Sequence, residues 1–113
     1  MMFSFRSYSE QFVCSYLFQN ESRSFILQRI STQVFQETNF EGLVRSKYKV
    51  LFESEKYLIL GGLLEYGTNN DNWIGYETTF IDKKIKSFQS HAITEPKYKD
   101  KVSALISGNC IVK

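Results

Sequence analysis

Four consecutive stretches of strand-forming residues, between Leu43 and Ile93, constrain the fold of this chain most. They cover residues 44–52, 56–66, 73–81 and 84–93. The breaks between them are short and hold residues that favour turns or resist burial, such as Ser54 and Asp82. We therefore predict an antiparallel four-stranded meander over about residues 43–93.

The length and composition fit one globular domain over residues 1–113. The chain is 42% hydrophobic and 23% charged, which argues against wholesale disorder. Its ten Phe and seven Tyr accompany only two alanines, Ala92 and Ala104. Aromatic side chains pack well on a pleated surface, so this balance favours strands over helices.

The two ends of the chain have sequence patterns that predict helices. Ser7 and Glu10 have the spacing of a capping box, and the apolar residues that follow, from Phe12 to Leu17, can share one helical face. Near the other end, Pro96 follows a capping threonine, and apolar residues recur at helical spacing up to Ile106. We expect a helical N-terminal segment and a short C-terminal helix at about 95–107.

The segment from Phe25 to Phe35 fits a helix and a strand equally well, because Ile26, Ile30 and Val34 are four residues apart. An even spacing places them on one face in either structure. The main expectation is an α+β fold, in which the meander is accompanied by these helices. If residues 9–36 are strands instead, the chain becomes a small all-β barrel or sandwich.

A basic stripe is the clearest charged feature of the meander. Strand alternation puts Arg45, Lys47 and Lys49 on one side, about 7 Å apart. Such a stripe can receive phosphates or an acidic partner. The alternative is a solvated strand face that nearby glutamates, including Glu53 and Glu65, neutralise.

The second predicted strand is apolar on both sides between Leu58 and Leu64, so we expect it to lie centrally with a cover on each face. A turn at Ser54 sets Val50 opposite Ile59, and we take that side as the core. The Gly61-Gly62 pair predicts a bulge or bend that curves the sheet.

No residue is assigned a catalytic role. His91 is the only histidine, which excludes a multi-histidine metal site. A short turn at Asp82 would pair His91 with Ile74 and place it on one face with Tyr76. Glu77 then lies on the opposite face, where partial burial could suit acid–base chemistry. We expect no bound metal and no cofactor.

Trp73 follows the polar stretch 67–72 directly, and tryptophan is enriched at binding hot spots. Tyr66 precedes the same stretch. The oxygen-rich run from Asn69 to Asn72 favours a turn over a calcium site, because a calcium loop needs a spaced set of ligands ending in a bidentate carboxylate.

Cys14 and Cys110 are expected to be free thiols, because two cysteines without a secretory signal are more often reduced. No stretch approaches the length of a membrane span. These observations predict a cytoplasmic protein that does not enter a membrane.

These features favour a non-enzymatic interaction protein of the inhibitor, immunity or accessory-factor type. It would act through a sheet face or the 67–73 loop, against a protein partner or a second copy of itself as a homodimer. The alternative is a small-ligand-binding protein or small enzyme with an aromatic pocket on a curved sheet. Nucleic-acid binding through the basic strand face comes third and is not expected. The candidate binding residues are Arg45, Lys47, Lys49, Tyr66, Trp73, Tyr76, Glu77 and His91.

Overall fold

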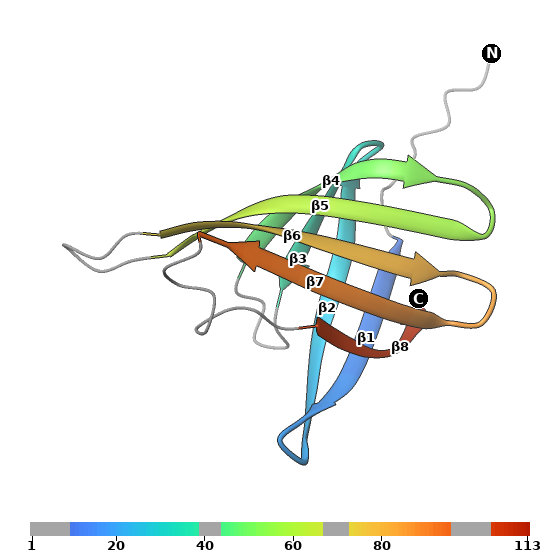
Figure 1. The fold of residues 1–113 in the computed structure, drawn as a ribbon. Helices are drawn as coiled ribbons and strands as arrows, with labels where there is room; N and C mark the ends of the chain where they lie inside the picture. Colours follow the sequence, from blue (N-terminus) through green and yellow to red (C-terminus); the bar gives the residue numbers. More distant parts are fainter. Residues whose placement is uncertain (1–9, 39–43, 67–72, 96–104) are drawn as a thin grey trace.

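The computed structural model of the chain is a closed barrel of eight antiparallel strands (Figure 1). It describes residues 10–38, 44–66, 73–95 and 105–113, and for residues 44–46, 64–66 and 73 the description covers the backbone only. The strands are β1 (Gln11–Phe18), β2 (Glu21–Ser31), β3 (Val34–Thr38), β4 (Val44–Glu53), β5 (Tyr57–Tyr66), β6 (Trp73–Asp82), β7 (Ser87–Thr94) and β8 (Leu105–Val112). Each strand pairs with its neighbours in the sequence, and β8 pairs with β1 to close the barrel.

The expected α+β class is therefore wrong, and the all-β barrel alternative is confirmed: the described residues contain no helix. The predicted N-terminal helix is strand β1, in which Phe12 and Cys14 are buried while Ser15 and Leu17 are exposed. Helical spacing was misleading here. Phe12 and Tyr16 are four residues apart, so they share a face in a strand as well as in a helix.

The ambiguous segment from Phe25 to Phe35 is also not helical: it consists of the end of β2, a turn at Thr32 and Gln33, and the start of β3. In β2 the buried residue is Leu27, whereas Ile30 on the other face is exposed. The β1–β2 hairpin turns on Gln19 and Asn20, which have φ angles of 50° and 66°. Two consecutive positive φ angles are what a two-residue hairpin turn of this hand requires, and asparagine tolerates them well.

The predicted C-terminal helix at about 95–107 is wrong where the structure can test it. Leu105, Ile106 and Ser107 begin strand β8, which pairs with β7 on one side and β1 on the other. Residues 96–104 of that prediction lie outside the described part of the chain. Leu105 and Ile106 have helical spacing from the earlier apolar residues, but this spacing does not determine their structure. Pairing of β8 with β1 and β7 does.

The central meander is confirmed as strands β4 to β7, but its registers differ from those expected. An irregularity between Val50 and Phe52 shifts the β4–β5 pairing, so Val50 lies opposite Leu60 instead of Ile59. Leu58 and Leu60 are consequently completely buried, and the opposite side of β5 faces outward. A shift of one residue turns every side chain of a strand to the other face.

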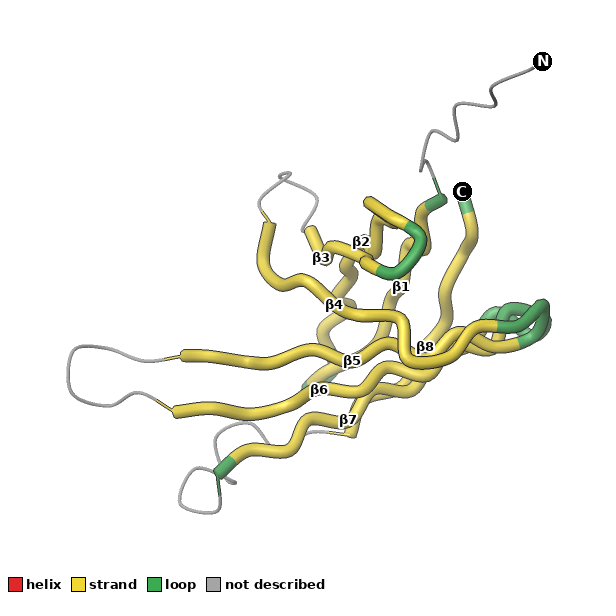
Figure 2. Tube along the Cα trace, turned by 90° about the horizontal axis from the view of Figure 1, so that it is seen from above, coloured by secondary structure: helices red, strands yellow, loops and turns green. Residues whose placement is uncertain are grey.

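The β6–β7 register also differs, because the connection spans residues 83–86 and not Asp82-Lys83 alone. Asp82 pairs with Ser87, and this pairing puts His91 opposite Thr78 instead of Ile74. Figure 2 shows β5, β6 and β7 running side by side, with the β4–β5 and β6–β7 turns at the same end. A backbone hydrogen bond of 2.7 Å from Lys83 N to Lys56 O joins the two turns.

Apolar side chains from all the strands fill the barrel interior. The buried cluster consists of Phe12, Cys14, Leu27, Phe35, Tyr48, Val50, Leu58, Leu60, Ile81, Phe88 and Cys110. An eight-stranded barrel is just wide enough for side chains to fill it or to hold one small ligand. Burial of these large side chains away from water is the main stabilising contribution to such a fold.

Arg29 covers one end of this core. Its guanidinium carbon lies 4.6 Å from the centroid of the Phe35 ring, and Nε donates to Glu10 Oε1 over 2.8 Å. Nη2 also donates to Glu53, which accepts a further hydrogen bond of 3.2 Å from Lys83 Nζ. Burial by itself would lower the pKa of Arg29, but the hydrogen bonds and negative charges of Glu10 and Glu53 raise it overall. The arginine therefore stays charged and ties three strand ends together.

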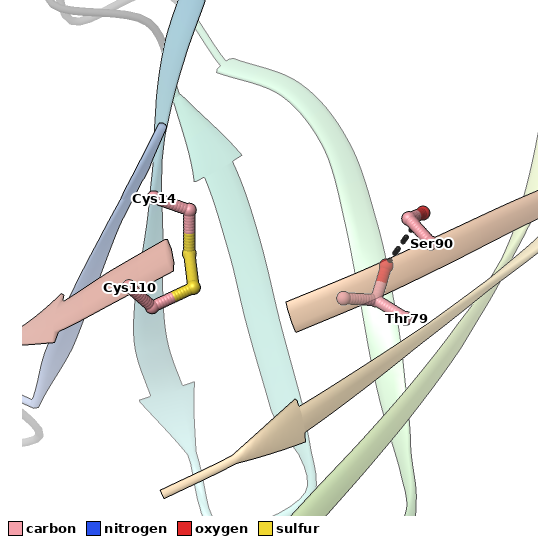
Figure 3. The surroundings of a disulfide bond; sticks show 4 residues. All are labelled: Cys14, Thr79, Ser90 and Cys110. Atoms are coloured by element: carbon pink, nitrogen blue, oxygen red, sulfur yellow. Dashed lines mark hydrogen bonds between the residues drawn. A yellow bond between two sulfur atoms is a disulfide. The ribbon is translucent and has the colours of Figure 1, made fainter. Parts of the chain in front are cut away.

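Cys14 and Cys110 form a disulfide bond, which corrects the expectation of free thiols (Figure 3). The two residues lie directly opposite each other in the β1–β8 pairing, and both are buried. The bond therefore links the first and last strands where the barrel closes. The spacing of the two cysteines in the sequence does not predict this contact, since they are 96 residues apart.

Candidate functional site

The outer side of strands β5 to β8 carries one charged side chain among those that the structure describes, Asp82 at the end of β6. Twelve of the uncharged side chains on this side are here called the neutral face: Tyr57, Ile59, Leu63, Ile74, Tyr76, Thr78, Phe80, Gln89, His91, Ile93, Leu105 and Ser107. With Asp82, Ser87, Asn109 and Ile111 the outer side has sixteen described side chains, and at the 23% share of charged residues in the whole chain about four of them would carry a charge. The depletion is therefore a property of this face and not of the chain.

Large apolar side chains of the neutral face are open to solvent. Leu63, Tyr76 and Ile93 are opposite one another on three adjacent strands and form a continuous row. Their exposed fractions are 60%, 39% and 62%, and Leu105 on β8 is 65% exposed. Single exposed apolar residues are normal on a protein surface, but a contiguous group of them marks a site of interaction.

His91 lies within this face, in the next row across the strands. It pairs with Thr78 on β6 and with Leu105 on β8, and it is exposed. The expected common face with Tyr76 is confirmed, whereas the expected pairing with Ile74 is not. Its described cross-strand neighbours are uncharged, so His91 has the surroundings of a contact residue.

A groove of about 640 Å³ borders the neutral face. It is lined by Gln33, Val34, Lys47, Tyr48, Lys49, Gly61, Gly62, Leu63 and Tyr76. Gly61 makes room for it: a Cβ atom at Gly61 would meet Tyr76 Oη at 2.1 Å and Leu51 Cδ1 at 2.8 Å. Tyr76 therefore reaches across a strand position that has no side chain.

Lys47 and Lys49 are both exposed on the β4 side of this groove. Neither has an ion-pair partner among the described residues. Glu53, which the sequence suggested as a neutralising group, is instead paired with Arg29 and Lys83 at the barrel end. Arg45 belongs to the same strand, but its side chain lies outside the described part.

Glu77 is directed to the opposite side of the sheet, as expected. Tyr48 Oη donates to Glu77 Oε1 over 2.8 Å, and Glu37 Oε1 lies 3.2 Å from the same hydroxyl. A phenol carries one proton, so it donates to only one of these carboxyl groups at a time. Nearby, Thr79 and Ser90 are buried and hydrogen-bonded to each other through their hydroxyls at 3.1 Å (Figure 3).

The predicted binding residues thus do not form one site. The sheet separates Glu77, inside the barrel, from Lys47, Lys49, Tyr76 and His91, outside it. Tyr66 and Trp73 pair with each other at the ends of β5 and β6, and their side chains lie outside the described residues. The stretch 67–72 is likewise not described.

Sequence reasoning missed Leu63, Ile93 and Leu105 as candidates for binding. The sequence held a signal for Leu63, the apolar character of β5 on both sides, which predicted a cover on each face, but none for Ile93 on β7 or Leu105 on β8. The barrel core covers only the inner side, and on the outer side Leu63 is 60% exposed. Identifying the exact residues required the registers of β5 to β8.

The described residues include no group of three or more His, Cys, Asp or Glu side chains that could hold a metal ion. The same part of the chain has no helix that is able to span a membrane. Comparison with known protein families, curated proteins and solved structures finds no match to this chain.

Proposed function

We propose that this protein is a non-enzymatic interaction protein that binds a protein partner through its neutral face. The observation that carries the proposal is the scarcity of charge on the outer side of β5 to β8, where Asp82 is the one charged side chain described, combined with the exposed row Leu63, Tyr76 and Ile93. The centres of protein–protein interfaces are depleted of charged residues and enriched in aromatic ones. Covering a face of this composition costs little desolvation free energy, because few charged groups are removed from water.

The arrangement of the ionisable residues also favours binding over turnover. His91 and Glu77 were the two groups that the sequence suggested for acid–base chemistry. They lie on opposite sides of the sheet, so they cannot act together on one substrate. General acid–base catalysis needs both groups within hydrogen-bonding reach of the reacting atoms.

A second copy of the chain is one partner that the neutral face would fit. Barrel closure removes the free strand edges through which a sheet would otherwise pair with another chain. Self-association would therefore bury the outer face of β5 to β8 and not extend the sheet. Light scattering at micromolar concentration separates a homodimer from a monomer that binds a different protein.

Site-specific photo-cross-linking in cells of the source organism tests the proposal. A photoreactive amino acid at position 93 lies on the neutral face, and one at position 85 is the matched control. Ile85 is a similar side chain, 70% exposed, in the β6–β7 turn. We expect a discrete adduct from position 93 and none from position 85. The same adducts from both positions, or none from position 93, would contradict the proposal.

A second candidate function is the binding of a small molecule inside the barrel. It is favoured by the inward polar groups Glu37, Tyr48 and Glu77, which lie beside the apolar core. A polar ligand held there would hydrogen-bond to the Tyr48 hydroxyl. Native mass spectrometry of the protein from its source tests this, because a retained ligand adds mass that Tyr48→Phe should reduce.

A further inference from the structure

We infer that the groove beside Lys47 and Lys49 binds an extended segment of a partner protein in which acidic and apolar residues alternate. This inference rests on the proposed function, since it names the chemistry of one part of the partner. It follows from the two unlike walls of the groove, their spacing and the floor between them.

The first wall supplies positive charge. Lys47 and Lys49 are both exposed on β4, and no described residue neutralises either of them. Two residues along a strand correspond to roughly 7 Å, so the two lysine side chains extend from the strand at that separation. An extended peptide presents its alternate side chains at the same spacing. Carboxylates two residues apart therefore match the two lysines.

The second wall is apolar. Leu63 and Tyr76 are opposite each other on β5 and β6, and both remain substantially exposed. Successive side chains of an extended chain point to opposite sides. A segment that lies along the groove with carboxylates toward the lysines thus directs the intervening side chain toward Leu63 and Tyr76. The pattern it requires is acidic, apolar, acidic.

The floor between the walls is Gly61, which is covered by the Tyr76 hydroxyl. Gly61 pairs with Lys49 on one side and with Thr78 on the other, and it presents no side chain of its own between the two walls. The nearest atoms that an added Cβ would meet are the outer ends of Tyr76 and Leu51, which can move. Gly61→Ala should therefore fill the floor without disturbing the core, which makes it a useful test variant.

Fluorescence anisotropy with labelled peptides tests the inference. The probe is fluorescein-labelled Gly-Glu-Leu-Glu-Leu-Glu-Gly, and the control Gly-Glu-Glu-Leu-Leu-Glu-Gly has the same composition but no two glutamates two positions apart. We expect tighter binding of the alternating peptide, weakening as salt screens the exposed charges. Replacing both lysines, Lys47→Ser with Lys49→Ser, should weaken it roughly tenfold, since each exposed charge pair contributes modestly.

Two further variants make the result specific. Lys84→Ser removes an exposed lysine from the β6–β7 turn and should leave peptide binding unchanged. The charge-reversed pair, Lys47→Glu with Lys49→Glu, should transfer the preference to Gly-Lys-Leu-Lys-Leu-Lys-Gly. This exchange distinguishes direct contact from a loss of folding, because an unfolded variant would bind neither peptide.

Three outcomes would overturn the inference: equal affinity for the two glutamate peptides, binding that is unaffected in the double serine variant, or displacement of the peptide by a short oligothymidylate. The last would assign the lysines to nucleic acid. Cross-linking from position 93 reports on the neutral face independently of the lysines. If it succeeds while the peptide fails to bind, only the acidic–apolar partner segment is refuted, and the proposed function stands.

Discussion

Removal of the Cys14–Cys110 disulfide should destabilise the barrel by several kcal/mol. The bond links residues 96 apart in sequence. A cross-link that closes a loop of this size restricts the unfolded chain, and the loop-entropy estimate for roughly 100 residues is about 4.7 kcal/mol. Native disulfides in small domains typically contribute about 2–5 kcal/mol, so we expect a loss of about 3–5 kcal/mol from the free energy of unfolding.

Urea denaturation of the oxidised protein, the reduced protein and the double variant Cys14→Ala, Cys110→Ala measures this loss. With a slope near 2 kcal/mol per molar urea, the unfolding midpoint should fall by about 2 M. Reductant should lower the midpoint of the native protein and leave that of the double variant unchanged. The reduced protein and the variant then differ only by the packing of the two small side chains.

The argument would be refuted if the native protein unfolded at the same urea concentration with and without reductant. Mass spectrometry checks the starting state, because the oxidised protein is lighter by two hydrogen atoms. Both cysteines are buried, so reduction is carried out on the unfolded chain and the protein is refolded before measurement. Labelling of both thiols in the unreduced, denatured protein would show that the bond is absent.

Three further predictions concern packing, charge and redox state. Gly62→Ala should lower the free energy of unfolding by about 1–3 kcal/mol, because its Cβ would lie 2.7 Å from the Tyr48 ring and 2.8 Å from a backbone oxygen. Gly61→Ala should change it by no more than about 0.5 kcal/mol, and equal losses in urea denaturation would refute this contrast. Arg29→Met should lower stability by about 1–3 kcal/mol, measured in the same way, since it removes the hydrogen bonds to Glu10 and Glu53, and an unchanged midpoint would show that the arginine is dispensable. Rapid alkylation in cells should leave Cys14 and Cys110 unlabelled, because they form a disulfide, and since disulfides are rare in the cytosol this result would place the protein in an oxidising compartment; trapping of both cysteines as thiols would instead agree with the predicted cytoplasmic location.

The sequence by itself determined the positions of the central strands. The predicted stretches 44–52, 56–66 and 73–81 differ from β4, β5 and β6 by at most one residue at each end, and only the start of β7 was placed three residues too early. Dense strand-forming residues separated by short polar turns are a local signal, and local signals survive without knowledge of distant contacts. The same reasoning found that β5 is apolar on both sides, but the cover that this predicted for its outer face stays a prediction, since Leu63 is 60% exposed.

Tertiary structure decided which side of β5 faces the core: Val50 of β4 is buried as predicted, but its partner is Leu60 and not Ile59. An irregularity near Leu51 moves Leu58 and Leu60 into the interior, and nothing in the local pattern of β5 specifies it. Because side chains alternate strictly along a strand, that single shift also determines which residues form the neutral face.

The sequence offered a closed barrel only as an alternative to the α+β fold. Phe12 and Tyr16 have a spacing that suits helix and strand equally, and pairing with β2 and β8 decides between them. That pairing brings Cys14 against Cys110 across almost the whole chain. Local propensity concerns neighbours within a few residues, whereas the pairing that completes β1 comes from residues 92 to 100 positions away. The barrel, its disulfide and its outer face are therefore consequences of long-range pairing.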